Sequence, residues 1–102
     1  MSEGFRVVVP ARLGSTRLPE KVLRPIAGKP LVQHAFEAAW RSGADEVIIA
    51  TDSERVAVAC REFGGVVAMT SPLHTSGTDR INEVARARGW PEQMIVVNLQ
   101  GD

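Results

Sequence analysis

A stretch near the amino terminus, VVVPARLGSTRLPEKVL (residues 7–23), joins a hydrophobic run to a strongly basic loop. Residues 12–29 contain five basic side chains: Arg12, Arg17, Lys21, Arg24 and Lys29. Glu20 is the one acidic side chain in this range, so the local excess is four positive charges. The whole chain has twelve basic and twelve acidic side chains, and its formal net charge is zero. Because the positive charge is concentrated in one loop, the pattern favours a small, highly charged anionic ligand over a polymer.

The composition of this loop suits phosphate groups. Polyphosphate is held by N–H groups and cations, since several negative charges gather in a small volume. Gly14 permits close backbone approach, Ser15 and Thr16 offer hydroxyls, and three side chains supply charge: Arg12, Arg17 and Lys21. The loop matches neither GxGxxG nor GxxxxGK[ST], so neither a dinucleotide fingerprint nor a Walker loop applies. A solvated, basic surface loop is the alternative interpretation.

Two aspartates follow predicted strands. Asp102, at the end of NLQGD, is a candidate Mg²⁺ ligand because Mg²⁺ in nucleotide sites takes one or two carboxylates plus phosphate oxygens. An aspartate in such a position can instead cap a helix, and for Asp52, in ATDS, the capping role is favoured.

The segment HTSGTDR (residues 74–80) opens a predicted helix, whose first N–H groups could bind a base or a phosphate. The alternative is a simple capping segment with Arg80 facing solvent.

The elements that position these residues are indicated by periodicity. Three helical patterns end at glycines and cover residues 30–43, 53–64 and 76–89. Their apolar stripes place Cys60 and Trp40 in the core, and Asp52 or Ser53 caps the second helix. Four short β-branched runs are nearly continuous rather than alternating, which is typical of strands buried on both faces: residues 5–9, 46–50, 66–69 and 94–99.

The alternation of strands and helices predicts an α/β fold, with a parallel, Rossmann-like sheet and helices on both faces. In the common doubly wound order 3-2-1-4, strands 1 and 4 are neighbours, and ligands bind beyond their carboxyl ends. That order brings the basic loop and Asp102 to one crevice. The sheet is expected to be incomplete, with residues 1–102 forming the N-terminal part of a larger domain.

Composition narrows the functional class. One cysteine cannot form an internal disulfide, and MSEGFRVVVP lacks the long apolar segment of a signal peptide or membrane span. Net neutrality and five aromatic residues argue against a broad nucleic-acid surface. A soluble cytoplasmic protein without nucleic-acid or membrane partners is expected.

Five segments taken together resemble the 3-deoxy-manno-octulosonate (Kdo) cytidylyltransferases, or CMP-Kdo synthetases. They follow the family's order over residues 5–102: VVVPARLGSTRLPEKVL, IAGKPLVQHAFEAA, VIIATDSERV, MTSPLHTSGTDRINEV and IVVNLQGD. The first two carry motifs of the wider sugar nucleotidyltransferase group, whereas TSGTDR followed by NLQGD narrows the likeness to this member. One departure is Glu20-Lys21-Val22, where the family usually has Gly-Lys-Pro.

The resemblance implies a GT-A-type nucleotide-binding fold and a Mg²⁺-dependent reaction of CTP with Kdo, which gives CMP-Kdo and pyrophosphate for lipopolysaccharide synthesis. Residues 1–102 would be the N-terminal, CTP-binding part, inactive alone, of a homodimeric enzyme whose sugar-binding remainder and second metal-binding aspartate lie elsewhere. The resemblance assigns the triphosphate to Arg12, Ser15, Arg17 and Lys21, and Mg²⁺ to Asp102. The cytidine portion or its surroundings fall to five further residues: Ser76, Gly77, Thr78, Arg80 and Gln100. Arg12, Lys21 and Asp102 would act in catalysis.

Two alternatives remain open from the sequence. One is a cytidylyltransferase for another 2-keto acid sugar, of the sialic-acid type. The other is a non-catalytic module that binds a nucleotide and turns nothing over.

Overall fold

The computed structural model of the chain describes residues 4–11, 25–71, 77–90 and 95–98. These ranges contain three helices: α1 (Leu31–Arg41), α2 (Glu54–Glu62) and α3 (Gly77–Arg88). They also contain six strands: β1 (Phe5–Pro10), β2 (Pro25–Ile26), β3 (Lys29–Pro30), β4 (Glu46–Thr51), β5 (Val67–Met69) and β6 (Ile95–Asn98). The seven larger elements fall within a residue or two of the predicted ranges.

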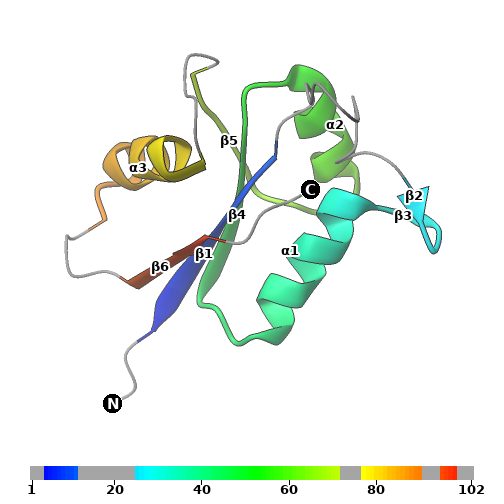
Figure 1. Cartoon of the computed structure of the whole chain (residues 1–102), viewed down its shortest axis with the longest axis horizontal. Coiled ribbons are helices and arrows are strands. Elements are labelled where there is room, and N and C mark those ends of the chain that lie inside the picture. Colours follow the sequence, from blue (N-terminus) through cyan, green and yellow to red (C-terminus); the bar gives the residue numbers. More distant parts are fainter. Residues whose placement is uncertain (1–3, 12–24, 72–76, 91–94, 99–102) are drawn as a thin grey trace.

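Four strands form one sheet in the order β5-β4-β1-β6 (Figure 1). Every neighbouring pair in it is parallel, with Val7 opposite Val47 and Val8 opposite Asn98. In chain order these are strands 3-2-1-4, so the predicted doubly wound order is confirmed. β1 and β4 lie at the centre and carry the β-branched runs, as expected for strands covered on both faces.

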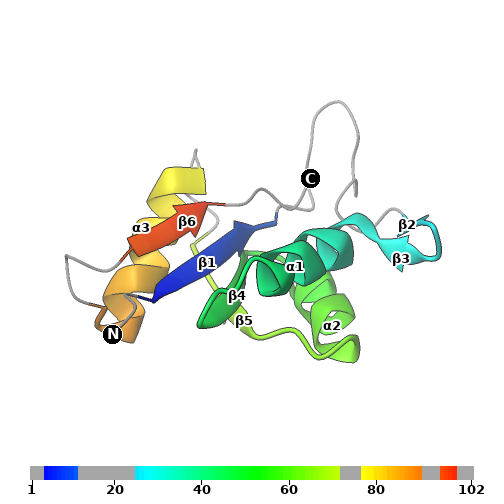
Figure 2. The same ribbon diagram turned by 90° about the horizontal axis from the view of Figure 1, so that it is seen from below.

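Residue alternation along the strands divides the interior into two cores. Val7, Val9, Val47 and Ile49 face α1 and α2, together with Phe36 and other buried residues of those helices. The alternate residues, including Val8 and Ile48, face Val84 of α3 on the opposite side. Figure 2 shows α3 on one face of the sheet and α1 and α2 on the other. The prediction of helices on both faces is confirmed.

Cys60 and Trp40 differ in their burial. Cys60 is fully buried among the residues of the α1 and α2 side, as predicted, and burial raises the pKa of its thiol to about 11. Trp40 was expected in the core but is 45% exposed, with its ring edge-on to Phe36 at a centroid distance of 6.2 Å. Trp40 lies at the boundary of the apolar stripe on α1, where the amphipathic helix turns toward solvent.

A small hairpin precedes α1 and was not predicted. β2 and β3 pair antiparallel through Ile26 and Lys29, and the two residues between them both have positive φ angles, 53° at Ala27 and 82° at Gly28. Positive φ at both central positions defines a type I′ turn, whose twist matches a two-residue hairpin. Its two-residue strands are too short to produce a detectable alternation in the sequence.

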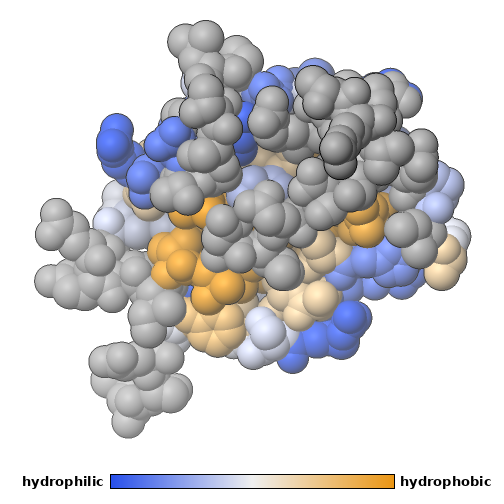
Figure 3. All heavy atoms as spheres, in the orientation of Figure 1, coloured by the Kyte–Doolittle hydropathy of each residue, from blue (hydrophilic) through white to orange (hydrophobic). Residues whose placement is uncertain are grey.

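The outer surface carries some apolar character. Val97 of β6, an edge strand of the described sheet, is 41% exposed. Figure 3 shows apolar surface in the region of β1 and β6. Within the described ranges, no helix combines the length and the hydropathy that crossing a membrane would require.

Candidate functional site

The carboxyl ends of the four parallel strands form one edge of the sheet. The strands remain paired to that edge, because Ala11 donates its backbone N–H to Ala50 O at 2.8 Å and Thr70 to Thr51 O at 2.9 Å. The chain leaves β1 after Pro10 and β6 after Asn98, and these two strands are direct neighbours. Since parallel strands end at the same edge, the segments that begin at residues 12 and 99 leave from adjacent points.

A buried arginine lies at this edge. Arg80 is only 1% exposed, although it belongs to the first turn of α3. Its Nη1 donates to Thr70 Oγ1 at 2.5 Å and to the Ser71 carbonyl oxygen at 3.4 Å. Its Nη2 lies 4.0 Å from Asp52 Oδ2, which makes an ion pair at the outer limit of direct contact. Its Nε, also buried, has no partner among the described residues.

A second contact ties α3 to the same segment of chain. Glu83, one turn beyond Arg80, accepts a hydrogen bond from the backbone N–H of Ser71 at 3.0 Å. Residues three apart lie on one side of a helix, so Arg80 and Glu83 both face the chain that leaves β5. The first half of α3 is therefore fixed to the carboxyl end of β5 by two side chains.

The start of α2 separates the roles of Asp52 and Ser53. Ser53 is the N-cap, and its Oγ accepts from the backbone N–H of Val56 at 3.3 Å. The backbone N–H of Ser53 in turn donates to Thr51 Oγ1 at 3.1 Å. The favoured capping role of Asp52 is therefore wrong, because the next residue performs it and the Asp52 carboxylate is directed to Arg80.

One charge of the basic segment is paired within the protein. Lys29, in the hairpin, donates to Glu37 of α1 at 2.9 Å. Hydrogen bonds from Lys29 and from Gln33 hold the pKa of Glu37 below its ordinary value. Lys29 therefore links the hairpin to α1. The positive charge available to a ligand must come from the basic residues that precede Lys29 in the sequence.

The structure describes only some of the predicted site residues. Gly77 and Thr78 form the beginning of α3, and Arg80 is buried beside them, so its expected alternative of facing solvent is wrong. The other predicted contacts lie outside the described residues: Arg12, Ser15, Arg17, Lys21, Ser76, Gln100 and Asp102. In the described part of the chain, no group of three or more His, Cys, Asp or Glu side chains could hold a metal ion.

Sequence reasoning missed Thr70 and the contact between Asp52 and Arg80. Thr70 lies within the segment MTSPLHTSGTDRINEV, but nothing in the local sequence distinguishes it as a partner of an arginine ten residues later. Arg80 did carry a local signal. It lies four residues before Val84, which is 1% exposed, so helical periodicity places both on the inward face.

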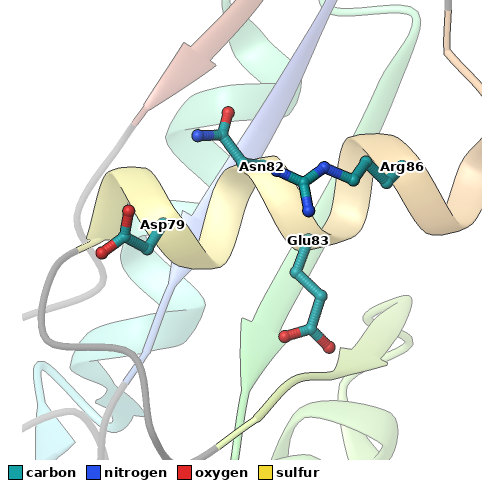
Figure 4. Close-up of a pocket in the computed structure, with 4 residues that line it drawn as sticks. All are labelled: Asp79, Asn82, Glu83 and Arg86. Carbon is teal, nitrogen blue, oxygen red and sulfur yellow. The ribbon is translucent and has the colours of Figure 1, made fainter.

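A shallow hollow of about 320 Å³ lies along α3. Figure 4 shows the four residues that line it, spaced along the helix: Asp79, Asn82, Glu83 and Arg86. Two carboxylates, one amide and one guanidinium give the hollow a formal net charge of −1. This hollow therefore lacks the cation-rich character of a phosphate site.

Comparison with known proteins gives a consistent result. The family model described as cytidylyltransferase matches residues 6–102. Proteins named 3-deoxy-manno-octulosonate cytidylyltransferase are 56% identical in Coxiella burnetii (strain RSA 493) and 58% identical in Vibrio cholerae (strain M66-2). Both alignments cover 96% of this chain and 39% of the relative, so the chain spans about two-fifths of the length of the proteins it matches.

Solved structures agree in fold. A CMP:2-keto-3-deoxy-manno-octonic acid synthetase in complex with CTP has a TM-score of 0.86 at 48% identity, over 99% of this chain and 41% of that one. A cytidylyltransferase from Leptospira borgpetersenii has a TM-score of 0.76 at 22% identity, over 99% of this chain and 42% of that one. At that identity the second likeness shows the fold alone.

Proposed function

This chain belongs to the cytidylyltransferase family, and we propose that it forms the CTP-binding part of an enzyme that transfers CMP from CTP to Kdo, with release of pyrophosphate. The observation that carries the proposal is the identity of 56–58%, over 96% of the chain, to proteins named for that reaction. The likeness to a synthetase structure that contains CTP supports CTP as the nucleotide.

The reaction requires little covalent chemistry from the protein. A hydroxyl oxygen of the sugar attacks the α-phosphorus of CTP in line, the bond to the bridging oxygen of the β-phosphate breaks, and the hydroxyl proton is lost. The protein must position the reactants and neutralise the charge that grows on the phosphoryl oxygens. We assign no general base among the described residues.

We assign the triphosphate to four residues that follow β1: Arg12, Ser15, Arg17 and Lys21. Arginine can grip two phosphate oxygens at once, whereas lysine acts as a point charge. The support from the structure is topological, because the segment that contains these residues starts at the carboxyl end of β1, beside β6. Gly77 and Thr78, at the start of α3, are assigned with Ser76, Arg80 and Gln100 to the cytidine portion or its surroundings.

Magnesium is proposed as the cofactor, held by Asp102. The donor chemistry fits, since Mg²⁺ prefers carboxylate, phosphate and water oxygens, and Asp102 follows a strand that neighbours β1. When bound, Mg²⁺ would offset phosphate charge and favour departure of pyrophosphate. The lipopolysaccharide role, the cytoplasmic location and the homodimer remain predictions from the family resemblance.

The test is an assay of the natural full-length gene product. We expect pyrophosphate release and a CMP-sugar product, identified by mass spectrometry, only when CTP, Kdo and Mg²⁺ are all present. Replacing Kdo by N-acetylneuraminate tests the sialic-acid alternative, and replacing CTP by UTP tests the choice of base. Turnover with N-acetylneuraminate but not Kdo would overturn the assignment of the sugar. CTP binding by calorimetry without turnover of either sugar would favour a non-catalytic module.

A further inference from the structure

The environment of Arg80 is unusual for a charged side chain. An arginine is rarely buried fully unless its charge is paired, because removing an ion from water carries a large free-energy cost. Here the guanidinium is 1% exposed, the Asp52 carboxylate lies 4.0 Å from Nη2, and Nε has no partner among the described residues. A hydrophobic side chain would fill such a position at a lower cost in desolvation, so packing alone does not account for an arginine here.

The partners of Arg80 come from two different strand ends. Asp52 follows β4, and Thr70 and Ser71 follow β5, whereas Arg80 itself belongs to α3. The planar guanidinium presents five donors in a fixed fork and can contact several groups at once. A lysine has a single terminal nitrogen and cannot span the same set. Arg80 therefore connects three elements at the edge of the sheet where nucleotide binding is proposed.

We propose that Arg80 is a positioning residue. Thr70 and Asp52 hold its guanidinium, and Arg80 thereby fixes the first turn of α3 against the carboxyl ends of β4 and β5. Gly77 and Thr78, candidate nucleotide contacts, occupy that same turn, so a shift of Arg80 moves them. Thr70 and Asp52 thereby become residues that affect CTP binding through Arg80. The inference rests on the proposed function, since it requires the first turn of α3 to border the bound CTP.

Three variants of the natural full-length gene product test the inference: Thr70→Val, Asp52→Asn and Arg80→Lys. Thr70→Val keeps the side-chain shape and removes the hydroxyl that accepts from Arg80 Nη1. The matched control is Arg86→Lys, the same substitution at an exposed position of the same helix. Steady-state kinetics are measured at a temperature at which circular dichroism shows every variant to be folded.

We expect Arg80→Lys and Thr70→Val to raise the KM for CTP about tenfold and Asp52→Asn to raise it less, because its contact is longer. In all three variants the KM for the sugar should stay within about twofold of that of the natural protein. The control Arg86→Lys should keep its KM for CTP within the same limit. Because residues that act through one another are not additive, Thr70→Val combined with Arg80→Lys should be no worse than Arg80→Lys alone.

A purely structural role gives a different result. The free energy of unfolding would then fall in all three variants, while the KM for CTP stayed unchanged at temperatures where they are folded, and the inference would be overturned. Additive effects of Thr70→Val and Arg80→Lys would overturn it as well.

Should Arg80→Lys fail to fold, the KM for CTP of Thr70→Val and of Asp52→Asn, each compared with Arg86→Lys, still tests the inference. A natural protein that neither binds nor turns over CTP would overturn the proposed function together with this inference. Normal turnover with an unchanged KM in the variants would overturn the inference alone.

Discussion

At residue 60 a thiol is wholly enclosed by apolar side chains, and its pKa rises from an ordinary value near 9.0 to about 11 because burial disfavours the thiolate. Above pH 9 the unfolded thiol ionises before the folded one, so ionisation favours the unfolded chain. The contribution of Cys60 to stability is therefore complete below about pH 9 and is lost as the pH rises toward about 11. Urea unfolding at a series of pH values measures this loss.

The control for Cys60 is Cys60→Ala. This variant should be less stable than the natural protein below about pH 9, because loss of the sulfur leaves a void, and its stability should depend less steeply on pH between about 9 and about 11. The native thiol should also react slowly with a thiol reagent until the chain is unfolded. An identical pH slope in both proteins would contradict the environment described for Cys60.

Arg80 shows how far single residues can be predicted from this sequence. Its motif, TSGTDR, indicated a ligand contact or a solvated arginine, and the helical spacing from Val84 that is compatible with burial was not used. Thr70 and Asp52 could not be identified as its partners, because their contacts join segments of chain that only the folded sheet brings together. Such contacts depend on tertiary packing and leave no local pattern.

At the scale of elements, the start of α2 depends on one hydroxyl. Ser53 Oγ accepts from Val56 N and satisfies one of the free N–H groups of the first turn. Ser53→Ala should lower the free energy of unfolding by about 1 kcal/mol, whereas Ser53→Asp should restore most of it, since aspartate caps equally well. Urea unfolding of the full-length protein gives both values.

A matched control for Ser53 lies at the end of α1. Ser42 Oγ donates to the carbonyl oxygen of Ala39, which also accepts from the backbone N–H of Ser42. Because Ser42→Ala leaves that carbonyl a partner, it should cost less than Ser53→Ala. Equal losses in Ser53→Ala and Ser53→Asp would show that the hydroxyl of Ser53 does not cap α2.

The larger elements were predictable because their signals are local and strong. Continuous β-branched runs indicated four buried parallel strands, and helical stripes closed by glycine indicated three helices. The doubly wound order followed from general rules of crossover handedness and was confirmed. The hairpin of β2 and β3 was missed because its turn, Ala27-Gly28, places a non-glycine residue at positive φ, which sequence rules do not expect.

At the scale of the molecule, we expect catalysis to depend on two residues, Lys21 and Asp102, which follow neighbouring strands in the sequence. Lys21→Ala should raise the KM for CTP or lower kcat by at least about tenfold without changing stability by more than about 0.5 kcal/mol, because loop lysines seldom contribute to folding. Asp102→Asn should abolish activation by Mg²⁺. Mg²⁺ titrations of the full-length enzyme measure both effects, with Lys29→Ala as a control that breaks an ion pair to Glu37.

Unchanged kinetics in Lys21→Ala would remove that residue from the site, and normal Mg²⁺ activation of Asp102→Asn would remove the metal from Asp102. Neither role follows from the fold alone. The strand order shows that residues 12–21 and Asp102 follow adjacent strands in the sequence. The roles of the individual residues come from the resemblance to Kdo cytidylyltransferases. The chain spans about two-fifths of the length of its relatives, so the proposed transfer to Kdo is tested with the full-length gene product.

The central claim is that CTP binds where β1 and β6 end side by side. A crystal structure of the full-length gene product with CTP and Mg²⁺ tests it most directly. We predict the triphosphate against Arg12, Arg17 and Lys21, with the metal ion bound by Asp102 and the first turn of α3 beside the nucleoside. A nucleotide bound elsewhere, or Lys21 and Asp102 on opposite sides of the sheet, would contradict the claim.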